Sequence, residues 1–235
     1  MKRSRRYQGS ATLVPPETSF GIDEAIDKLK AGATAKFDET AEVTLSLGIR
    51  ASQVVVRGTC NLPHGTGKAV RILAFAKGES VTEAEQAGAD FVGGEDLAKR
   101  IQEGWFDFDK VVATPDMMPV VGKLGKVLGP RGLMPSPKTG TVTKDIGQVI
   151  GELKTGMVEF RTDRYGVVHT VFGKASFEPN ALKENLLAVI ESIAERKPEE
   201  GVKGRYVKKV CIASTMGPGI VLDSTEVQSV VDAVS

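Results

Sequence analysis

The sequence holds few of the residues on which metal centres and disulfide scaffolds depend. Among its 235 residues are two cysteines, two histidines and one tryptophan. Cys60 and Cys211 have neither a CxxC spacing nor a histidine cluster beside them, which excludes a zinc site and a disulfide framework. We interpret both as small buried residues in a reducing environment. His64 and His169 lie far apart in the sequence and belong to no triad or metal pattern, so no cofactor or metal is predicted.

Long apolar runs are missing as well. No stretch approaches 18 consecutive apolar residues, and no apolar segment follows the basic start MKRSRRYQ, so neither a membrane span nor a secretory signal is expected. We interpret the basic start as a solvated tail, with an arm that touches a polyanion as the alternative.

Overall charge excludes a globally basic nucleic-acid binder, because the formal net charge is only +1. The charge is unevenly distributed, however. Residues 77–109 carry nine acidic and three basic side chains, whereas residues 110–138 carry five basic and one acidic. Residues 203–209 hold four more lysines and arginines. Local basic patches of this kind can dock a polyanion on one face of a neutral protein.

Apolar periodicity predicts different structures at the ends and in the middle of the chain. Thr18 and Ser19 are candidate caps of a helix that follows, and the alternating runs 43–49 and 54–62 favour an antiparallel pair of strands. Residues 157–173 predict two strands joined by a turn at Asp163–Gly166, ahead of an amphipathic helix. The tail from Ser224 is predicted as a short helix or disorder.

Residues 69–157 instead alternate continuous apolar strands with helices, which favours a parallel sheet covered by helices. Within this region, residues 116–129 are predicted as one helix. The economical interpretation is an α/β protein of two domains. Residues 1–68 and 158–235 form a discontinuous domain, and residues 69–157 an inserted Rossmann-like domain. The alternative is two consecutive domains divided near residue 157.

Two glycine-rich stretches suggest phosphate binding but lack its full pattern. PHGTGKA, from Pro63, has Leu62 where a P-loop needs glycine, and Ala69 where it needs a hydroxyl. GKLGKVLGPRGLMPSPKTG, from Gly122, is basic but contains no carboxylate that could hold a metal for phosphoryl transfer. We therefore favour binding over catalysis there, with an ordinary loop of turn residues as the alternative. The basic residues of this stretch are Lys123, Lys126, Arg131 and Lys138.

Two shorter stretches carry groups suited to RNA. In KFDET, Lys36 can meet phosphate, Phe37 can stack and Thr40 can hydrogen-bond; alternatively, Phe37 anchors a loop in the core. In STMGPG, from Ser214, hydroxyls and bare glycine backbone can press on a groove and reach 2′-hydroxyls. A plain hairpin turn is the alternative for this second stretch.

Together these stretches resemble the bacterial type of the family of large-subunit ribosomal protein L-one. The resemblance covers about residues 18–222, and its most specific part begins at Gly122. The segments that carry it are KFDET, NLPHGTGK, AGADFVGG, FDKVVATPDMM, GKLGKVLGPRGLMPSPKTGTV, EFRTDRYGVVH and STMGP.

The resemblance implies a non-enzymatic, cytoplasmic, ribosome-associated protein. Its discontinuous domain would have a split β-α-β core, and its inserted domain would be Rossmann-like. It would bind large-subunit rRNA in the mobile stalk near the tRNA exit site, assist release of deacylated tRNA, and repress translation of its own-operon mRNA. Free in solution it would be a monomer without a small-molecule substrate. A nucleotide-binding Rossmann-like enzyme that uses the Gly/Lys-rich loops is the alternative.

Carried over residue by residue, the resemblance implies three RNA-binding strips and a secondary basic surface for tRNA or neighbouring rRNA. The sequence departs from the family pattern at Gly219, where a small hydroxylated residue is expected. The strips comprise Lys36, Phe37 and Thr40; Arg161, Asp163, Arg164 and His169; and Ser214, Thr215, Met216 and Gly217. The secondary surface comprises Lys123, Lys126, Arg131 and Lys138.

Overall fold

The structure, a computed structural model, describes residues 4–15, 18–51 and 53–234, without the side chains of Lys138 and Lys203. It divides into two compact units. Unit 1 consists of Met1–Gly67 and Gly156–Ser235, and unit 2 of Lys68–Thr155. Both ends of the chain thus contribute to unit 1. The fold is α/β, with a mainly antiparallel sheet in unit 1 and a parallel sheet in unit 2.

Unit 1 is built on a five-stranded sheet whose order is β1-β10-β9-β2-β8. Strand β2 pairs antiparallel with β8 on one side and with β9 on the other, while β1 and β10 run parallel. The strands are β1 (Ser19–Phe20), β2 (Thr40–Ile49), β8 (Val167–Lys174), β9 (Val202–Ser214) and β10 (Ile220–Leu222). The residues of β8 and β9 that pair with β2 follow their partners by more than 120 positions in the chain. Because these two strands occupy both edges of β2, the next strand in the sequence cannot pair with it.

The predicted antiparallel pair between the two N-terminal strands is therefore wrong. Strand β3 (Arg57–Asn61) pairs instead with β7 (Met157–Arg161) in a separate two-stranded ribbon. Strands β7 and β8 are joined by the predicted turn at Asp163–Gly166, but they share only the isolated bridge between Thr162 and Val168. Alternation identified strands correctly, but it says nothing about which distant strand completes the hydrogen bonds.

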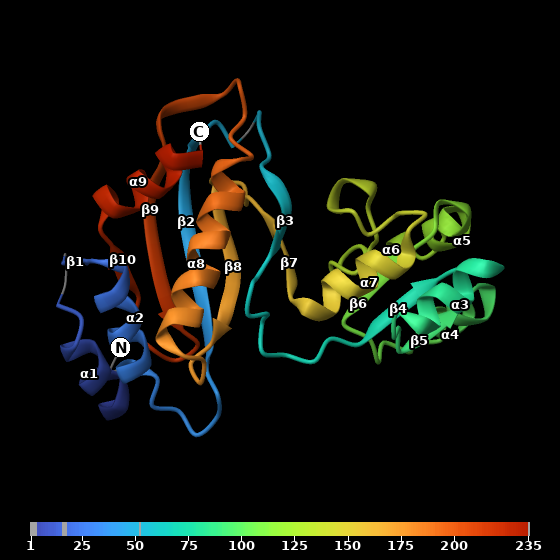
Figure 1. Cartoon of the computed structure of the whole chain (residues 1–235), viewed down its shortest axis with the longest axis horizontal. Coiled ribbons are helices and arrows are strands. Elements are labelled where there is room, and N and C mark those ends of the chain that lie inside the picture. The colour runs from blue at the N-terminus through green and yellow to red at the C-terminus, as the bar shows by residue number, and fades with distance from the viewer. Residues whose placement is uncertain (1–3, 16–17, 52, 235) are drawn as a thin grey trace. The chain divides into compact units, whose positions relative to one another are not determined.

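Three helices of unit 1 lie on the same side of the five-stranded sheet (Figure 1). They are α2 (Ile22–Gly32), α8 (Pro179–Ala194) and α9 (Ser224–Val234). Along β2 the buried residues Ala41, Val43 and Leu45 face them, and Glu42 alternates to the other side. The core of unit 1 thus lies between the helices and one face of the sheet, which leaves polar side chains of β2 on the opposite face.

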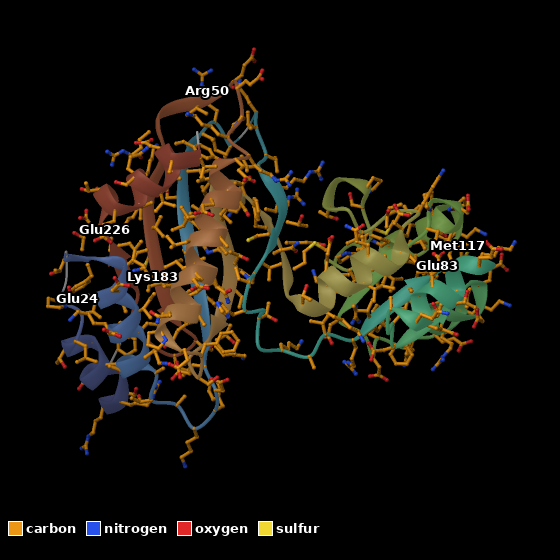
Figure 2. All side chains as sticks on the ribbon, in the orientation of Figure 1. Glu24, Arg50, Glu83, Met117, Lys183 and Glu226 are labelled. Carbon is orange, nitrogen blue, oxygen red and sulfur yellow. The ribbon has the colours of Figure 1, made fainter. Side chains whose placement is uncertain are left out.

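The start of α2 differs from the prediction. Ser19 lies in strand β1, and Gly21 is the residue that precedes the helix. The backbone N–H of Ile22 donates to Glu226 Oε2 at 2.8 Å, so a carboxylate from α9 satisfies a helix-end donor that a local cap would otherwise serve. Glu226 is labelled in Figure 2. The tail from Ser224 forms helix α9, which confirms the helix of the two predicted alternatives, helix or disorder.

The interpretation of the basic start as a solvated tail is wrong for the residues that the structure describes there. Helix α1 (Arg5–Thr12) begins after Ser4, whose Oγ accepts a hydrogen bond from the backbone N–H of Tyr7. Ser10 is buried against α2, so the helix is docked rather than frayed.

Unit 2 contains a three-stranded parallel sheet in the order β5-β4-β6, with apolar residues on both faces. Alternate residues of β4, such as Leu73 and Phe75, pack in one hydrophobic cluster with α4 and with α5 (Met118–Gly122) and α6 (Gly125–Leu128), while α3 packs against α7. The strands are β4 (Ile72–Phe75), β5 (Phe91–Gly93) and β6 (Lys110–Ala113), and the longer helices are α3 (Glu79–Gln86), α4 (Glu95–Gln102) and α7 (Ile146–Thr155).

The segment after β6 is not the single helix predicted over residues 116–129. It breaks into the short helices η1 (Pro115–Met117), α5 (Met118–Gly122) and α6 (Gly125–Leu128), followed by η2 (Pro137–Thr139). Pro119 and the glycines at 122 and 125 explain the breaks, because neither residue type favours a helix interior. Leu124 and Leu128 are fully buried and fix the segment to unit 2.

Candidate nucleic-acid interface

Two segments of unit 1 that are remote in sequence meet where β2 begins and β9 ends. Ala41 and Ser214 are register partners there. The backbone N–H of Thr40 donates to Thr215 Oγ1 at 2.9 Å, and the backbone N–H of Thr215 donates to the Thr40 carbonyl at 3.1 Å. KFDET and STMGPG therefore form one continuous surface, which we call the β2–β9 surface. It comprises Lys36, Phe37, Thr40, Thr215, Met216 and Gly217.

A buried carboxylate holds this surface together. Glu39 is 1% exposed, and its two oxygens accept hydrogen bonds from the backbone N–H groups of Ala35 and Met216, each at 2.9 Å. Burial acts to raise the pKa of Glu39, but these hydrogen bonds and the nearby Arg6 guanidinium outweigh it and lower the pKa below its usual value. The carboxylate is thus ionised at neutral pH and joins the loop before β2 to the turn after β9.

Two large apolar side chains are exposed on the same surface. Phe37 is 55% exposed and Met216 is 47% exposed, so the alternative that Phe37 is a core anchor is wrong. The loop that carries Phe37 is nevertheless fixed, because Asp38 accepts hydrogen bonds from the backbone N–H and hydroxyl of Ser176. Exposed apolar groups beside Lys36 suit the stacking and phosphate contacts that RNA offers.

Ser214 and Gly217 have a structural role in the turn. Ser214 is only 5% exposed, so its side chain is not accessible to an RNA bound on the surface. A Cβ atom at Gly217 would collide with Ser214 Oγ, so a larger residue there would force the Ser214 side chain to move. Of the third predicted strip, Thr215, Met216 and the backbone of Gly217 are the parts that reach the surface.

The second predicted strip lies farther along the sheet. His169 is exposed on β8 opposite Thr44, and its Nδ1 lies 3.2 Å from Thr44 Oγ1. The turn at Asp163–Gly166 lies beside Leu47, whose backbone N–H donates to the Gly166 carbonyl. Leu47 lies seven positions after Thr40 along β2, which corresponds to roughly 23 Å of strand. The structure thus spreads the strips along β2 rather than gathering them at one point.

Asp163 serves the turn itself. Its Oδ1 accepts hydrogen bonds from the backbone N–H groups of Val167 and Tyr165, both at 2.8 Å. The bond from Val167 is the main cause that lowers the pKa of Asp163. Arg161 and Arg164 are exposed and available to phosphate. Sequence reasoning missed Tyr165, which is 69% exposed with the Arg164 guanidinium 4.9 Å from its ring centroid.

The glycine-rich segment of unit 2 does not form a phosphate cradle. A cradle requires backbone N–H groups that point at a ligand, but those of Leu128, Gly129 and Leu133 donate within the segment. Gly132 and Gly140 have φ values of 70°, a conformation that turns require of glycine.

The positively charged side chains of this segment are nevertheless exposed to solvent. Lys123, Lys126 and Arg131 are exposed, and the Arg131 guanidinium lies 3.6 Å from the centroid of the Phe106 ring. The side chain of Lys138 lies outside the described residues. Three cations therefore remain as the described part of the predicted secondary basic surface.

The lysine of GTGK is also used structurally. Lys68 Nζ lies 2.7 Å from Asp109 Oδ1, and Arg71 contacts the other oxygen of this carboxylate. The hydrogen bond from Lys68 is the main cause that lowers the pKa of Asp109 to about 2. Gly65 and Gly67 have positive φ values, as a turn between units requires. Among the described residues, no group of three or more metal-binding side chains occurs, and no helix is long and apolar enough to cross a membrane.

Comparison with known proteins agrees with this arrangement. A model of the ribosomal protein L1p/L10e family matches residues 29–218, which include the whole β2–β9 surface. The chain belongs to the ribosomal protein L1p/L10e family. It is 57% identical over 225 residues to the large ribosomal subunit protein uL1 of Fervidobacterium nodosum, with 94% of this chain and 95% of that protein covered. It is 51% identical to uL1 of Cutibacterium acnes, with 95% and 97% covered.

Membership of the L1p/L10e family confirms the resemblance that the motifs indicated. It also decides between the two classes of function left open by the sequence: the chain is a ribosomal protein and not an enzyme. The buried Glu39 and the docked Arg6 were missed by sequence reasoning, because their partners at residue 216 are remote in the chain.

Proposed function

We propose that this chain is a structural component of the large ribosomal subunit, that it acts on ribosomes in the cytoplasm, and that it binds large-subunit rRNA through the β2–β9 surface. The observation that carries the proposal is the junction of Thr40 and Thr215. It places a lysine, two exposed apolar side chains, hydroxyls and bare glycine backbone on one ordered surface. This composition fits a groove with 2′-hydroxyls better than a small-molecule pocket.

The finer role rests on the resemblance of the motifs to the family. The protein would form the mobile stalk near the tRNA exit site and assist release of deacylated tRNA, with Lys123, Lys126 and Arg131 facing tRNA or neighbouring rRNA. It would also repress translation of its own-operon mRNA through the same surface that binds rRNA. When free it would be a monomer.

Recognition of RNA shape suits a protein with a net charge of only +1. A modest set of about three to five phosphate contacts would give a salt slope between about −2 and −4.5, since each contact contributes roughly −0.7 to −0.9. Lys36, Arg161 and Arg164 are exposed cations of unit 1 that can supply such contacts. Small residues and hydroxyls would then select the groove.

Substitution of Thr215 tests the interface. Thr215→Val removes a hydroxyl that accepts from Thr40 and that would meet RNA, so we expect RNA affinity to fall by about 1–3 kcal/mol. Thr215→Ser retains the hydroxyl and should bind almost as the parent does. Binding would be measured by gel shift with an rRNA fragment of the stalk, alongside unfolding curves. A folded Thr215→Val variant that binds like the parent would remove Thr215 from the interface.

Two further measurements address the broader proposal. Cosedimentation with large ribosomal subunits should show stoichiometric association of the parent protein. Titration calorimetry with ATP, GTP and NAD should show no binding, since GTGK lacks the full P-loop pattern and amides of the segment after Gly122 donate within that segment. Tight stoichiometric binding of any of these nucleotides would contradict the proposed function.

A further inference from the structure

Helix α1 is fixed against unit 1 by specific contacts. Ser10 Oγ donates to the Gly32 carbonyl at 3.2 Å, and Ser10 is only 5% exposed. At the end of the helix, Lys28 Nζ donates to the Leu13 carbonyl at 3.1 Å. These contacts join α1 to the last turn of α2, which leads directly into the loop of Lys36 and Phe37. Helix α1 is thereby placed beside the β2–β9 surface.

Arg6 extends from α1 to that surface. Its Nη1 lies 3.4 Å from Thr34 Oγ1 and its Nη2 lies 3.4 Å from the Met216 carbonyl oxygen. The same guanidinium is 3.9 Å from Glu39 Oε1, and the side chain remains 32% exposed. A guanidinium has five N–H donors and two flat faces. Arg6 can thus hold the two segments together and still present a planar cation to a ligand.

A surface pocket of about 420 Å³ lies at this junction, and we call it the α1 pocket. Its lining residues are Ser4, Arg6, Tyr7 and Met216. It combines a planar cation, an aromatic residue and a polarisable thioether, which are the groups on which nucleobases stack. Met216 belongs both to this pocket and to the β2–β9 surface, so the pocket continues the interface.

We propose that the α1 pocket holds one unstacked base of the RNA that the β2–β9 surface binds. The inference rests on the proposed function and adds Arg6 and Tyr7 to its binding residues. A base is favoured over a phosphate because, among the described lining residues, Arg6 alone is a cation, and Glu39 already balances its charge. Ser4 Oγ moreover accepts from the Tyr7 amide, which occupies a helix-end donor that a phosphate would need. Stacking of a base needs neither an unbalanced positive charge nor a free backbone N–H, and it tolerates any base.

The first test measures the affinity for the stalk rRNA fragment. Tyr7→Leu retains apolar bulk and helix propensity but removes the ring, so we expect affinity to fall about fivefold to a hundredfold, as loss of one stacked base does. Tyr7→Phe should bind within about twofold of the parent. The salt slope should stay unchanged in both variants, because no phosphate contact is lost. Leu13→Ala, at the exposed residue that follows the helix and outside the pocket, is the control and should bind like the parent.

The second test needs no substitution and therefore does not depend on how the variants fold. The parent protein would be irradiated with the same rRNA fragment carrying 4-thiouridine, and the adducts located by mass spectrometry. An adduct on Tyr7 supports the proposal, whereas an adduct on Met216 without one on Tyr7 reports only the β2–β9 surface and counts against the pocket. If Thr215→Val weakens binding while Tyr7→Leu does not, and no adduct forms on Tyr7, the pocket inference fails and the proposed function stands. If the parent does not bind the fragment, both fail.

Discussion

Glu39 Oε2 lies 2.9 Å from the backbone nitrogen of Met216, a residue 177 positions later in the chain. This hydrogen bond connects the beginning of β2 to the turn after β9. The same carboxylate receives the backbone N–H of Ala35, so it shapes the loop that exposes Phe37. One buried ionised group thus determines the relative placement of the segments that we propose to contact RNA.

Replacing Glu39 with glutamine should destabilise unit 1 and weaken RNA binding. Glutamine keeps the shape but turns one acceptor into an NH₂ group that faces a backbone N–H. We expect the free energy of unfolding to fall by about 2 kcal/mol, the scale of a hydrogen bond to a charged group. Urea unfolding followed by circular dichroism would measure this change. Glu42→Gln, at an exposed position of the same strand, is the matched control and should be nearly neutral.

The difference in unfolding free energy between the parent and Glu39→Gln should decrease as the pH falls. Because the pKa of Glu39 is lowered in the folded protein, its stabilising effect is complete above the ordinary value of 4.5 and is lost as the pH falls through the folded value. The gap in unfolding free energy between the parent and Glu39→Gln should be constant from about pH 5.5 to 7 and shrink below 4.5. A gap that widens in acid would show that the carboxylate is not stabilised by these contacts.

Asn185 should be essential to the turn through which the chain leaves unit 1. Its side chain is fully buried, donates to the carbonyls of Gly65 and Phe172, and accepts from the backbone N–H of His64. Asn185→Ala leaves these three backbone groups without this partner, and we expect a loss of about 3 kcal/mol. Asn180→Ala, on the exposed start of the same helix, is the control.

Trp105 allows the same experiment to test the proposed division into domains. It is the one tryptophan of the chain and lies in unit 2. If the predicted domains 1–68 with 158–235 and 69–157 unfold separately, Asn185→Ala should lower the midpoint seen by circular dichroism and leave the fluorescence midpoint of Trp105 unchanged. Parallel shifts of both midpoints would instead indicate one cooperative unit.

Local sequence patterns predicted much of the secondary structure but not the partners of each element. The alternation of Val43, Leu45 and Leu47 correctly indicates a strand with one buried face. Nothing in that alternation shows that β8 and β9 occupy both edges, so pairing with the neighbouring strand was the natural and mistaken expectation. The carboxylate of Glu226 at the start of α2 is a similar case, because a cap supplied from α9 leaves no local signal.

In the candidate site, too, the residue types could be read from the sequence but the contacts between remote residues could not. Residue types left Phe37 open between an RNA-stacking group and a core anchor, and left the stretch of Met216 open between an RNA contact and a plain turn. The exposure of both side chains decides that they lie on the surface. The role of Glu39 depends on its burial and on a partner at residue 216, neither of which the pentapeptide KFDET shows. Arg6 was assigned to a tail for the same reason, because its contacts are all made after folding.

The basic segment of unit 2 should contribute little to the principal rRNA contact. Lys123, Lys126 and Arg131 are exposed, and the backbone around them is satisfied internally. Replacing all three with alanine should leave the affinity for the stalk rRNA fragment within about twofold and the salt slope unchanged, because no phosphate contact of the β2–β9 surface is removed. Arg131→Ala also removes a guanidinium stacked on Phe106, so a small loss of stability of about 0.5–1 kcal/mol is expected. If the triple variant instead lost as much affinity as Thr215→Val, or if its salt slope fell by two or more, this segment would belong to the primary interface.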